Sequence, residues 1–148
     1  MFTQNKEAIL LEIDSLKRHN NLIVVEGEHD KYSLNALGLE RIFILNKTGV
    51  SIFNRIDDMI KQLDIKESCV ILTDLDKKGK AYYKMIKKEL KNHGKRSNGK
   101  LRDILSKNGV SHIEELANFI FSEEIEKERR EGSLHLKHLP IQEIRIKR

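Results

Sequence analysis

Short apolar runs alternate along this chain with longer stretches in which apolar residues recur at helical spacing. The runs at residues 22–25, 41–45 and 69–73 are too short for buried helices, and their apolar character predicts strands covered on both faces. The stretches between them, 29–37 and 50–63, have the spacing of amphipathic helices. The order of strand, helix, strand, helix and strand is typical of a parallel sheet with right-handed crossovers.

Further helices are predicted on both sides of this central pattern. Residues 6–18 and 78–91 each place apolar residues on one side of a helix, and residues 101–105 predict a shorter one. Ser111 and Glu114 have the spacing of a capping box, so a last helix is predicted to begin there. We therefore expect an α/β fold of three layers, α/β/α, with a central, mainly parallel sheet of four strands.

The fourth strand has no clear signature in the sequence. Residues 91–100 stand where a doubly wound sheet would place it, but they are polar and basic, contain two glycines and predict an exposed loop. Residues 132–148 alternate briefly between apolar and polar positions. This tail is expected either to add an edge strand or to form a basic arm that becomes ordered on binding.

The composition indicates a single globular domain. The chain has 148 residues, of which 39% are hydrophobic and 34% are charged. The length and the hydrophobic fraction are enough for the chain to bury a core. No apolar run is long enough to cross a membrane, and the first residues lack the pattern of a secretory signal, so we expect a cytoplasmic protein without a membrane partner. The single cysteine, Cys69, lies in a predicted strand, where a buried, unreactive thiol is expected. The six histidines show no spacing typical of a zinc site.

The net charge of +5 conceals a strong separation of charge along the chain. Residues 77–107 hold 12 basic and 2 acidic residues, a net charge of +10, immediately after two carboxylates. Most lysines of the helix predicted over 78–91 fall within one arc, which by itself is commonly only a solvated face. Their position next to the carboxylates favours a polyanionic partner such as nucleic acid. The candidate contacts to its backbone are Lys77, Lys78, Lys80 and Lys84.

Three carboxylates stand where predicted strands end. Glu26 follows the first strand, and Asp74 and Asp76 follow the third. All three converge if these strands are neighbours in a parallel sheet, which requires the second strand to lie outside the first. Converging carboxylates repel one another, and a divalent cation removes that cost; oxygen ligands favour Mg²⁺ or Mn²⁺, as one ion or two. Gly27 is expected to allow a tight turn after Glu26.

These residues form a combined pattern, in which an apolar strand is followed by E-G-x-x-D and a second apolar strand by D-x-D-x-x-G-K. The pattern resembles the Toprim domain, which is shared by topoisomerases, bacterial primases, OLD-type nucleases and the small maturation ribonucleases of bacterial ribosomal RNA. The resemblance runs from about residue 20 to residue 100, and the whole chain is similar to the small stand-alone Toprim proteins of archaea. It divides the chain into an N-terminal helix (1–19), a Toprim domain (20–100), C-terminal helices packed on the domain (101–131) and a basic tail (132–148).

The resemblance implies a role for each carboxylate. Glu26 matches the general acid or base and is also a candidate ligand to a second ion, Asp74 and Asp76 match the metal-binding aspartates, and Asp30 matches a supporting aspartate on the first helical turn. The implied function is Mg²⁺-dependent, nuclease-like phosphoryl transfer on nucleic-acid phosphodiesters, with the lysines holding the backbone.

Two alternatives belong to other functional classes. Some Toprim proteins, including recombination mediators, serve as adaptors, so this chain would bind a metal and a nucleic acid or a protein partner without turnover. The complete acidic set favours a metal site, but metal binding does not prove catalysis. A nucleotide-binding switch has weaker support, because the chain has neither a G-x-G-x-x-G motif nor a Walker loop.

Overall fold

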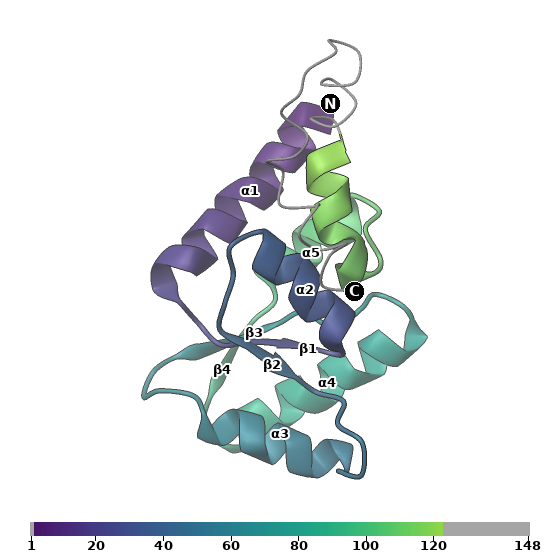
Figure 1. Cartoon of the computed structure of the whole chain (residues 1–148). Coiled ribbons are helices and arrows are strands. Elements are labelled where there is room, and N and C mark those ends of the chain that lie inside the picture. Colours follow the sequence, from purple (N-terminus) through teal and green to yellow (C-terminus); the bar gives the residue numbers. More distant parts are fainter. Residues whose placement is uncertain (1, 123–148) are drawn as a thin grey trace.

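The computed structural model describes the backbone of residues 2–122 and places four parallel strands in one sheet (Figure 1). The strands are β1 (Ile23–Val25), β2 (Ile42–Ile44), β3 (Ser68–Ile71) and β4 (Arg96–Asn98). Their order across the sheet is β2-β1-β3-β4. The first and third strands are therefore neighbours and the second lies outside the first, as the convergence of the carboxylates requires.

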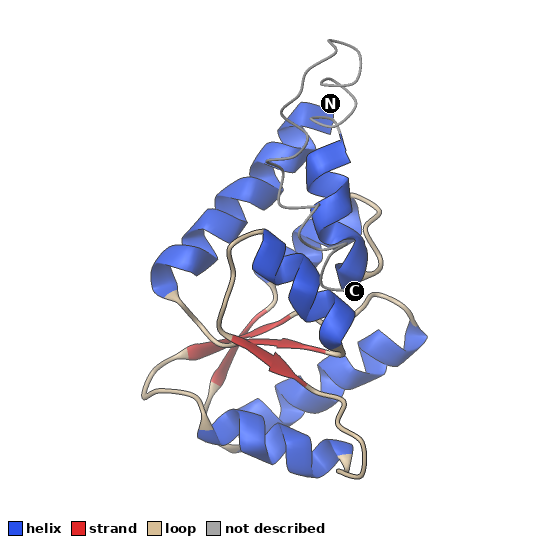
Figure 2. Ribbon diagram, viewed as in Figure 1, coloured by secondary structure: helices blue, strands red, loops and turns tan. Residues whose placement is uncertain are grey.

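Helices cover both faces of the sheet and complete the three layers (Figure 2). On one face lie α1 (Phe2–His19), α2 (Glu28–Ala36), α5 (Lys100–Lys107) and the 3₁₀ turn η1 (Ile113–Glu115), which continues as a helix over 116–122. On the other face lie α3 (Ile52–Lys61) and α4 (Lys77–Asn92). The predicted three-layer α/β/α fold with a four-stranded parallel sheet is confirmed.

β1 is buried on both faces of the sheet because its successive side chains point to opposite layers. In β1, Ile23 and Val25 join the core beneath α1, α2 and α5, whereas Val24 and the preceding Leu22 join the core against α3 and α4. Each of these four side chains is at most 2% exposed. Such a strand can carry a charge only where it ends, and this places Glu26 at the carboxyl edge of the sheet.

The position of β4 corrects the prediction of an exposed loop over residues 91–100. Residues 96–98 pair in parallel with β3, with Arg96 opposite Ser68 and Asn98 opposite Val70. The three residues are polar and exposed or half-buried, because β4 is the edge of the sheet and is held through its backbone. An edge strand of this kind needs no apolar pattern, so hydrophobic periodicity could not reveal it.

Some predictions concern residues that the structure does not describe, whereas those on membrane spans and on Cys69 can be compared with it. The predicted basic tail, with its possible edge strand, and residues 123–131 of the predicted C-terminal helices lie outside the described residues. Within the described part, no helix is long and apolar enough to span a membrane. Cys69 is fully buried, and burial raises the pKa of its thiol to about 12, as expected for an unreactive cysteine.

Candidate metal site at the sheet edge

Asp74 and Asp76 lie on the turn that joins β3 to α4. Asp76 is the N-cap of α4, and its carboxylate accepts a hydrogen bond from the backbone N–H of Gly79 over 2.7 Å. The buried Thr73 hydroxyl donates to the carbonyl oxygen of Gly79 over 2.8 Å. Gly79 packs so closely that a Cβ there would lie 1.9 Å from the carbonyl oxygen of Asp74. Glycine at position 79 is therefore a steric requirement of this turn.

Glu26 lies against this turn from the end of β1. Its carboxylate accepts a hydrogen bond from the backbone N–H of Asp74 over 2.8 Å, and the residue is 8% exposed. Burial raises the pKa of the Glu26 carboxyl, the hydrogen bond from Asp74 opposes the rise, and the negative charges of Asp74 and Asp76 add to it. The structure thus brings Glu26 to the aspartate pair across two neighbouring strands.

The turn after Glu26 differs from the sequence expectation. Gly27 has extended backbone angles (φ −145°, ψ −178°), and a Cβ added there would meet nothing within 4 Å. The expected need for glycine in a tight turn is therefore wrong. The turn is instead held by Asp30, which is 6% exposed and whose carboxylate accepts from the backbone N–H of Gly27 over 3.0 Å. Burial raises the pKa of Asp30 to about 6, despite that hydrogen bond, and the charges of Asp74 and Glu26 contribute to the rise.

His112 is brought to the site from the C-terminal segment, and sequence reasoning missed it. Its Nδ1 lies 3.5 Å from a carboxylate oxygen of Asp74, and the other oxygen accepts from the backbone N–H of Ile113 over 2.9 Å. The predicted capping box of Ser111 and Glu114 is wrong, because His112 is the N-cap of η1, and the carboxylate that bonds this helix start belongs to Asp74. A cap supplied from 39 residues away leaves no local signal in the sequence.

Asp74, Asp76 and His112 together form a group that could hold a metal ion. Each offers one ligand atom, and these atoms lie within 4.8 Å of one another. Two atoms that each lie about 2.1 Å from one ion are at most about 4.2 Å apart, so small side-chain movements would close the group around an ion. Carboxylate oxygens and an imidazole nitrogen suit a divalent cation. Glu26 is not in this group, and its role as a ligand stays a prediction.

Comparison with known proteins agrees with this geometry. The Toprim-like family model matches residues 23–108, more than half of the chain, from the start of β1 to the end of α5. The chain belongs to the Toprim-like family. A UPF0292 protein of Methanocaldococcus jannaschii is 33% identical over 77% of this chain and 91% of its own. A UPF0292 protein of Pyrococcus abyssi is 29% identical over 80% of this chain and 88% of its own. The solved structure of an Aquifex aeolicus protein, 26% identical, has a TM-score of 0.62 and covers 74% of this chain and 95% of that one.

Membership of the Toprim-like family implies a metal-binding function related to nucleic acid, and the acidic group at the edge of the sheet could hold the ion. The two archaeal relatives agree with the resemblance to small archaeal Toprim proteins. His112 lies beyond residue 108, so it is contributed by a segment outside the family match.

A buried arginine of α5 binds the backbone of the turn that carries Asp74. Arg102 of α5 is 8% exposed, and its guanidinium donates to the carbonyl oxygens of Thr73 (3.0 Å) and Asp74 (2.9 Å). The guanidinium also lies over the ring of Tyr83, 4.4 Å from its centre. These contacts fix the backbone from which the Asp74 side chain projects. No local pattern indicates this role, because Arg102 is one of several basic residues in its segment.

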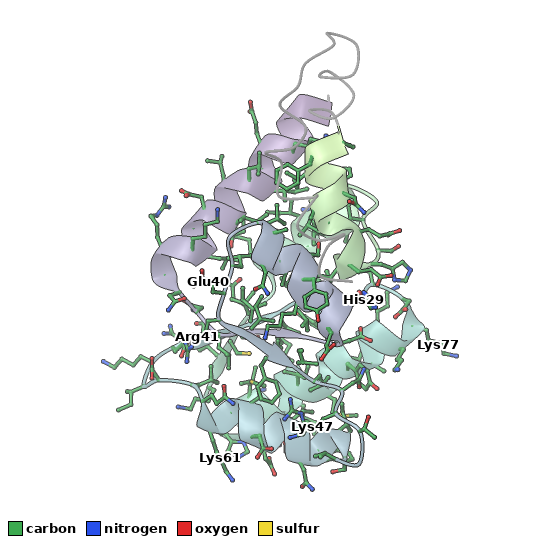
Figure 3. The ribbon with its side chains drawn as sticks, viewed as in Figure 1. His29, Glu40, Arg41, Lys47, Lys61 and Lys77 are labelled. Carbon is green, nitrogen blue, oxygen red and sulfur yellow. The ribbon has the colours of Figure 1, made fainter. Side chains whose placement is uncertain are left out.

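The four predicted nucleic-acid contacts, Lys77, Lys78, Lys80 and Lys84, are all exposed on α4. Lys77 begins this helix on the same side of the molecule as His29 near the start of α2, where β1 and β3 end (Figure 3). The amino group of Lys78 lies 5.5 Å from the centre of the Tyr82 ring. Burial raises the pKa of Glu26, and the Lys78 charge opposes part of that rise. The lysines therefore begin beside the acidic residues, and their contact with nucleic acid stays a prediction.

Two clefts flank the loop that follows β2, next to Glu26. One, of about 630 Å³, lies beside the start of α2 and is lined by Lys47 and Arg55. The other, of about 400 Å³, lies between the same loop and Tyr82 of α4. The loop is held to the site because the Asn46 N–H donates to the carbonyl oxygen of Glu26 over 3.0 Å. Lys47 thus adds an exposed cationic group that the sequence did not single out. The Arg55 guanidinium is instead bonded to the carbonyl oxygens of Ile44 and Leu45.

Proposed function

We propose that this Toprim-like protein is a Mg²⁺- or Mn²⁺-dependent enzyme that acts on nucleic-acid phosphodiesters by nuclease-like phosphoryl transfer. The observation that carries the proposal is the contact of Glu26 with the backbone of Asp74, because it joins a buried carboxyl to the metal-compatible group. The residues that would hold the ion are Asp74 and Asp76. When bound, the ion would supply positive charge to a phosphodiester and stabilise the charge that develops during transfer.

Glu26 is suited to handle a proton in this reaction. One of its carboxylate oxygens is held by the amide of Asp74, which fixes the orientation of the side chain. Its raised pKa brings the carboxyl closer to the neutral range in which a general acid or base works best. Asp30 would support it by holding the backbone of Gly27 in the extended conformation that follows Glu26.

The exposed cations around the site would hold the sugar-phosphate backbone. Lys77, Lys78, Lys80 and Lys84 extend from the acidic turn along α4, and Lys47 lines the cleft beside the start of α2. Contacts of this type release counterions from nucleic acid and weaken steeply with salt. Aromatic residues make up only 5% of the chain, so recognition of the backbone is favoured over base stacking.

A non-catalytic Toprim adaptor is the second candidate, and one observation favours it. Asp74 accepts from the N–H of Ile113 and Asp76 accepts from the N–H of Gly79, so both aspartates bond helix starts. These carboxylates would therefore contribute to the fold even in a protein that binds nucleic acid or a protein partner without turnover.

A cleavage assay distinguishes the two candidates. Labelled RNA and DNA are incubated with the wild type, Asp76→Asn and Asp57→Asn, with Mg²⁺, Mn²⁺ or EDTA. Asparagine still caps α4 but loses the charge that an ion requires, whereas Asp57 is an exposed residue of α3. The enzyme predicts metal-dependent cleavage that Asp76→Asn loses and Asp57→Asn retains. Equal, metal-independent binding by all three proteins, without cleavage, would support the adaptor.

A further inference from the structure

We propose that His112 is a third protein ligand of the ion and that it makes the site prefer transition-metal dications such as Mn²⁺ and Co²⁺ over Mg²⁺. This inference rests on the proposed function, because it concerns the ion at Asp74 and Asp76. It adds a nitrogen ligand from outside the Toprim-like match to a site that the sequence predicted to contain oxygen ligands alone.

The backbone on both sides of His112 is fastened to the acidic turn. The carbonyl oxygen of Ser111 accepts from the N–H of Leu75 over 2.8 Å, and the N–H of Ile113 donates to the Asp74 carboxylate over 2.9 Å. His112 lies between these two bonds, so its position is set by its neighbours and does not depend on any contact of its own ring.

The segment is also anchored away from the site. Ile113 is fully buried in the core beneath α2, and the N–H of Ala117 donates to the Ser33 hydroxyl of α2 over 3.0 Å. An imidazole carried by such a segment is held at the acidic group at little further cost in conformational entropy, as a preorganised ligand requires.

A structural role explains the imidazole poorly. The His112 side chain makes no capping hydrogen bond in η1, and the N–H of Ile113 is bonded to Asp74. Its 3.5 Å separation from Asp74 is longer than a normal hydrogen bond, and the side chain is 43% exposed, so an ion pair there stabilises the fold little. That exposure also leaves the imidazole open to an ion arriving from solvent.

The ligand chemistry points to the class of metal. Mg²⁺ prefers oxygen ligands and retains its waters, whereas imidazole nitrogen suits the first-row transition metals. A site with two carboxylates and one imidazole would accept Mg²⁺ through its oxygens. It would gain the additional nitrogen bond only with ions such as Mn²⁺ or Co²⁺.

Binding of Mn²⁺ and Mg²⁺ by calorimetry tests the proposal on the full chain, in the wild type and in three variants. His112→Ala removes the proposed nitrogen ligand, Asp76→Asn removes an oxygen ligand, and His29→Ala is the control, an exposed histidine of α2. We expect His112→Ala to weaken Mn²⁺ binding about tenfold or more and Mg²⁺ binding about twofold or less. His29→Ala should change neither affinity. Pulsed EPR of bound Mn²⁺ should show nitrogen modulation that is lost in His112→Ala and kept in His29→Ala.

The outcomes separate this inference from the proposed function. One outcome would overturn the role of His112 alone. Asp76→Asn would weaken the binding of both ions, His112→Ala would leave the ratio of the two affinities unchanged, and bound Mn²⁺ in the wild type would show no nitrogen modulation. His112 would then be no ligand, and the proposed function would stand. If the wild type binds neither ion, the proposed function fails and the role of His112 fails with it. Thermal unfolding of each variant shows whether the protein is folded before its affinity is interpreted.

Discussion

The carboxylate of Glu26 accepts a hydrogen bond from the backbone N–H of Asp74, 2.8 Å away, although 48 positions separate the two residues in the chain. The bond exists because β1 and β3 are adjacent and parallel, so both chains leave the sheet at the same edge. It places a buried carboxyl beside a group that could hold an ion.

Replacing Glu26 by glutamine should separate catalysis from structure. The amide oxygen of Gln can still accept from the N–H of Asp74, so the fold and ion binding should persist. The proton-handling group is lost, and the rate of Mg²⁺-dependent cleavage should fall by about 10²- to 10⁴-fold. Glu28→Gln, the neighbouring exposed carboxylate, is the control and should cleave at the wild-type rate. Equal rates for Glu26→Gln and wild type would rule out the proposed role.

The two glycines beside the site should respond differently to alanine. At Gly79 a Cβ would lie 1.9 Å from the carbonyl oxygen of Asp74, so the turn must move, and we expect a loss of about 3 kcal/mol in the free energy of unfolding. At Gly27 the backbone is extended and the space is open, so alanine should cost at most about 1 kcal/mol, the difference between these residues at an N-cap. Urea denaturation measures both, and equal losses would contradict the described packing.

Asp30 should make stability depend on pH in a defined direction. Its pKa is about 6 in the folded protein and 3.8 ordinarily, so the folded state binds this proton more tightly than the unfolded state does. The corresponding stabilisation is present below about pH 4 and is lost as the pH rises to about 6. Asparagine does not titrate, so the free energy of unfolding of Asp30→Asn should rise relative to that of the wild type as the pH increases from about 4 to about 6, by up to about 3 kcal/mol.

The measurement for Asp30 is the free energy of unfolding of both proteins at several pH values, with EDTA present so that no ion contributes. Asp57→Asn, which changes an exposed carboxylate on α3, should follow the wild type throughout. A constant difference between Asp30→Asn and wild type from pH 4 to pH 8 would show that Asp30 titrates normally.

The cations beside Glu26 should bind nucleic acid more strongly than those elsewhere. Lys47→Ala and Lys78→Ala should each weaken oligonucleotide binding several-fold and reduce the slope of log affinity against log salt by about 1, because each removes one phosphate contact. Lys61 at the end of α3 lies away from the starts of α2 and α4, and Lys61→Ala should change neither quantity (Figure 3). Fluorescence anisotropy over a salt series measures both. An affinity that is flat with salt would mean that the lysines form only a solvated face.

Much of the fold could be predicted because its signals are local. The runs that became β1 and β3 are buried on both faces of the sheet and that of β2 is partly buried, so each is a continuous apolar run in the sequence. The charge that ends two of them marks the edge of the sheet. The convergence of Glu26 and Asp74 was predicted on the condition that β1 and β3 are neighbours, and the sheet order meets that condition.

The parts that could not be predicted depend on contacts between distant residues. β4 is a polar edge strand that pairs with β3 through its backbone, so it carries no apolar run. His112 reaches the site because Asp74 bonds the start of η1, and Arg102 because the carbonyl oxygens at the end of β3 need donors. None of these relationships leaves a period or a spacing in the sequence.

The central claim is that an ion binds between Asp74 and Asp76 beside Glu26, and crystals soaked in Mn²⁺ test it most directly through anomalous scattering. The account predicts a peak within about 2.2 Å of a carboxylate oxygen from each aspartate. The same crystals of Asp76→Asn should lack the peak. A wild-type crystal in which both carboxylates keep only their helix N–H partners, with no anomalous density between them, would contradict the account.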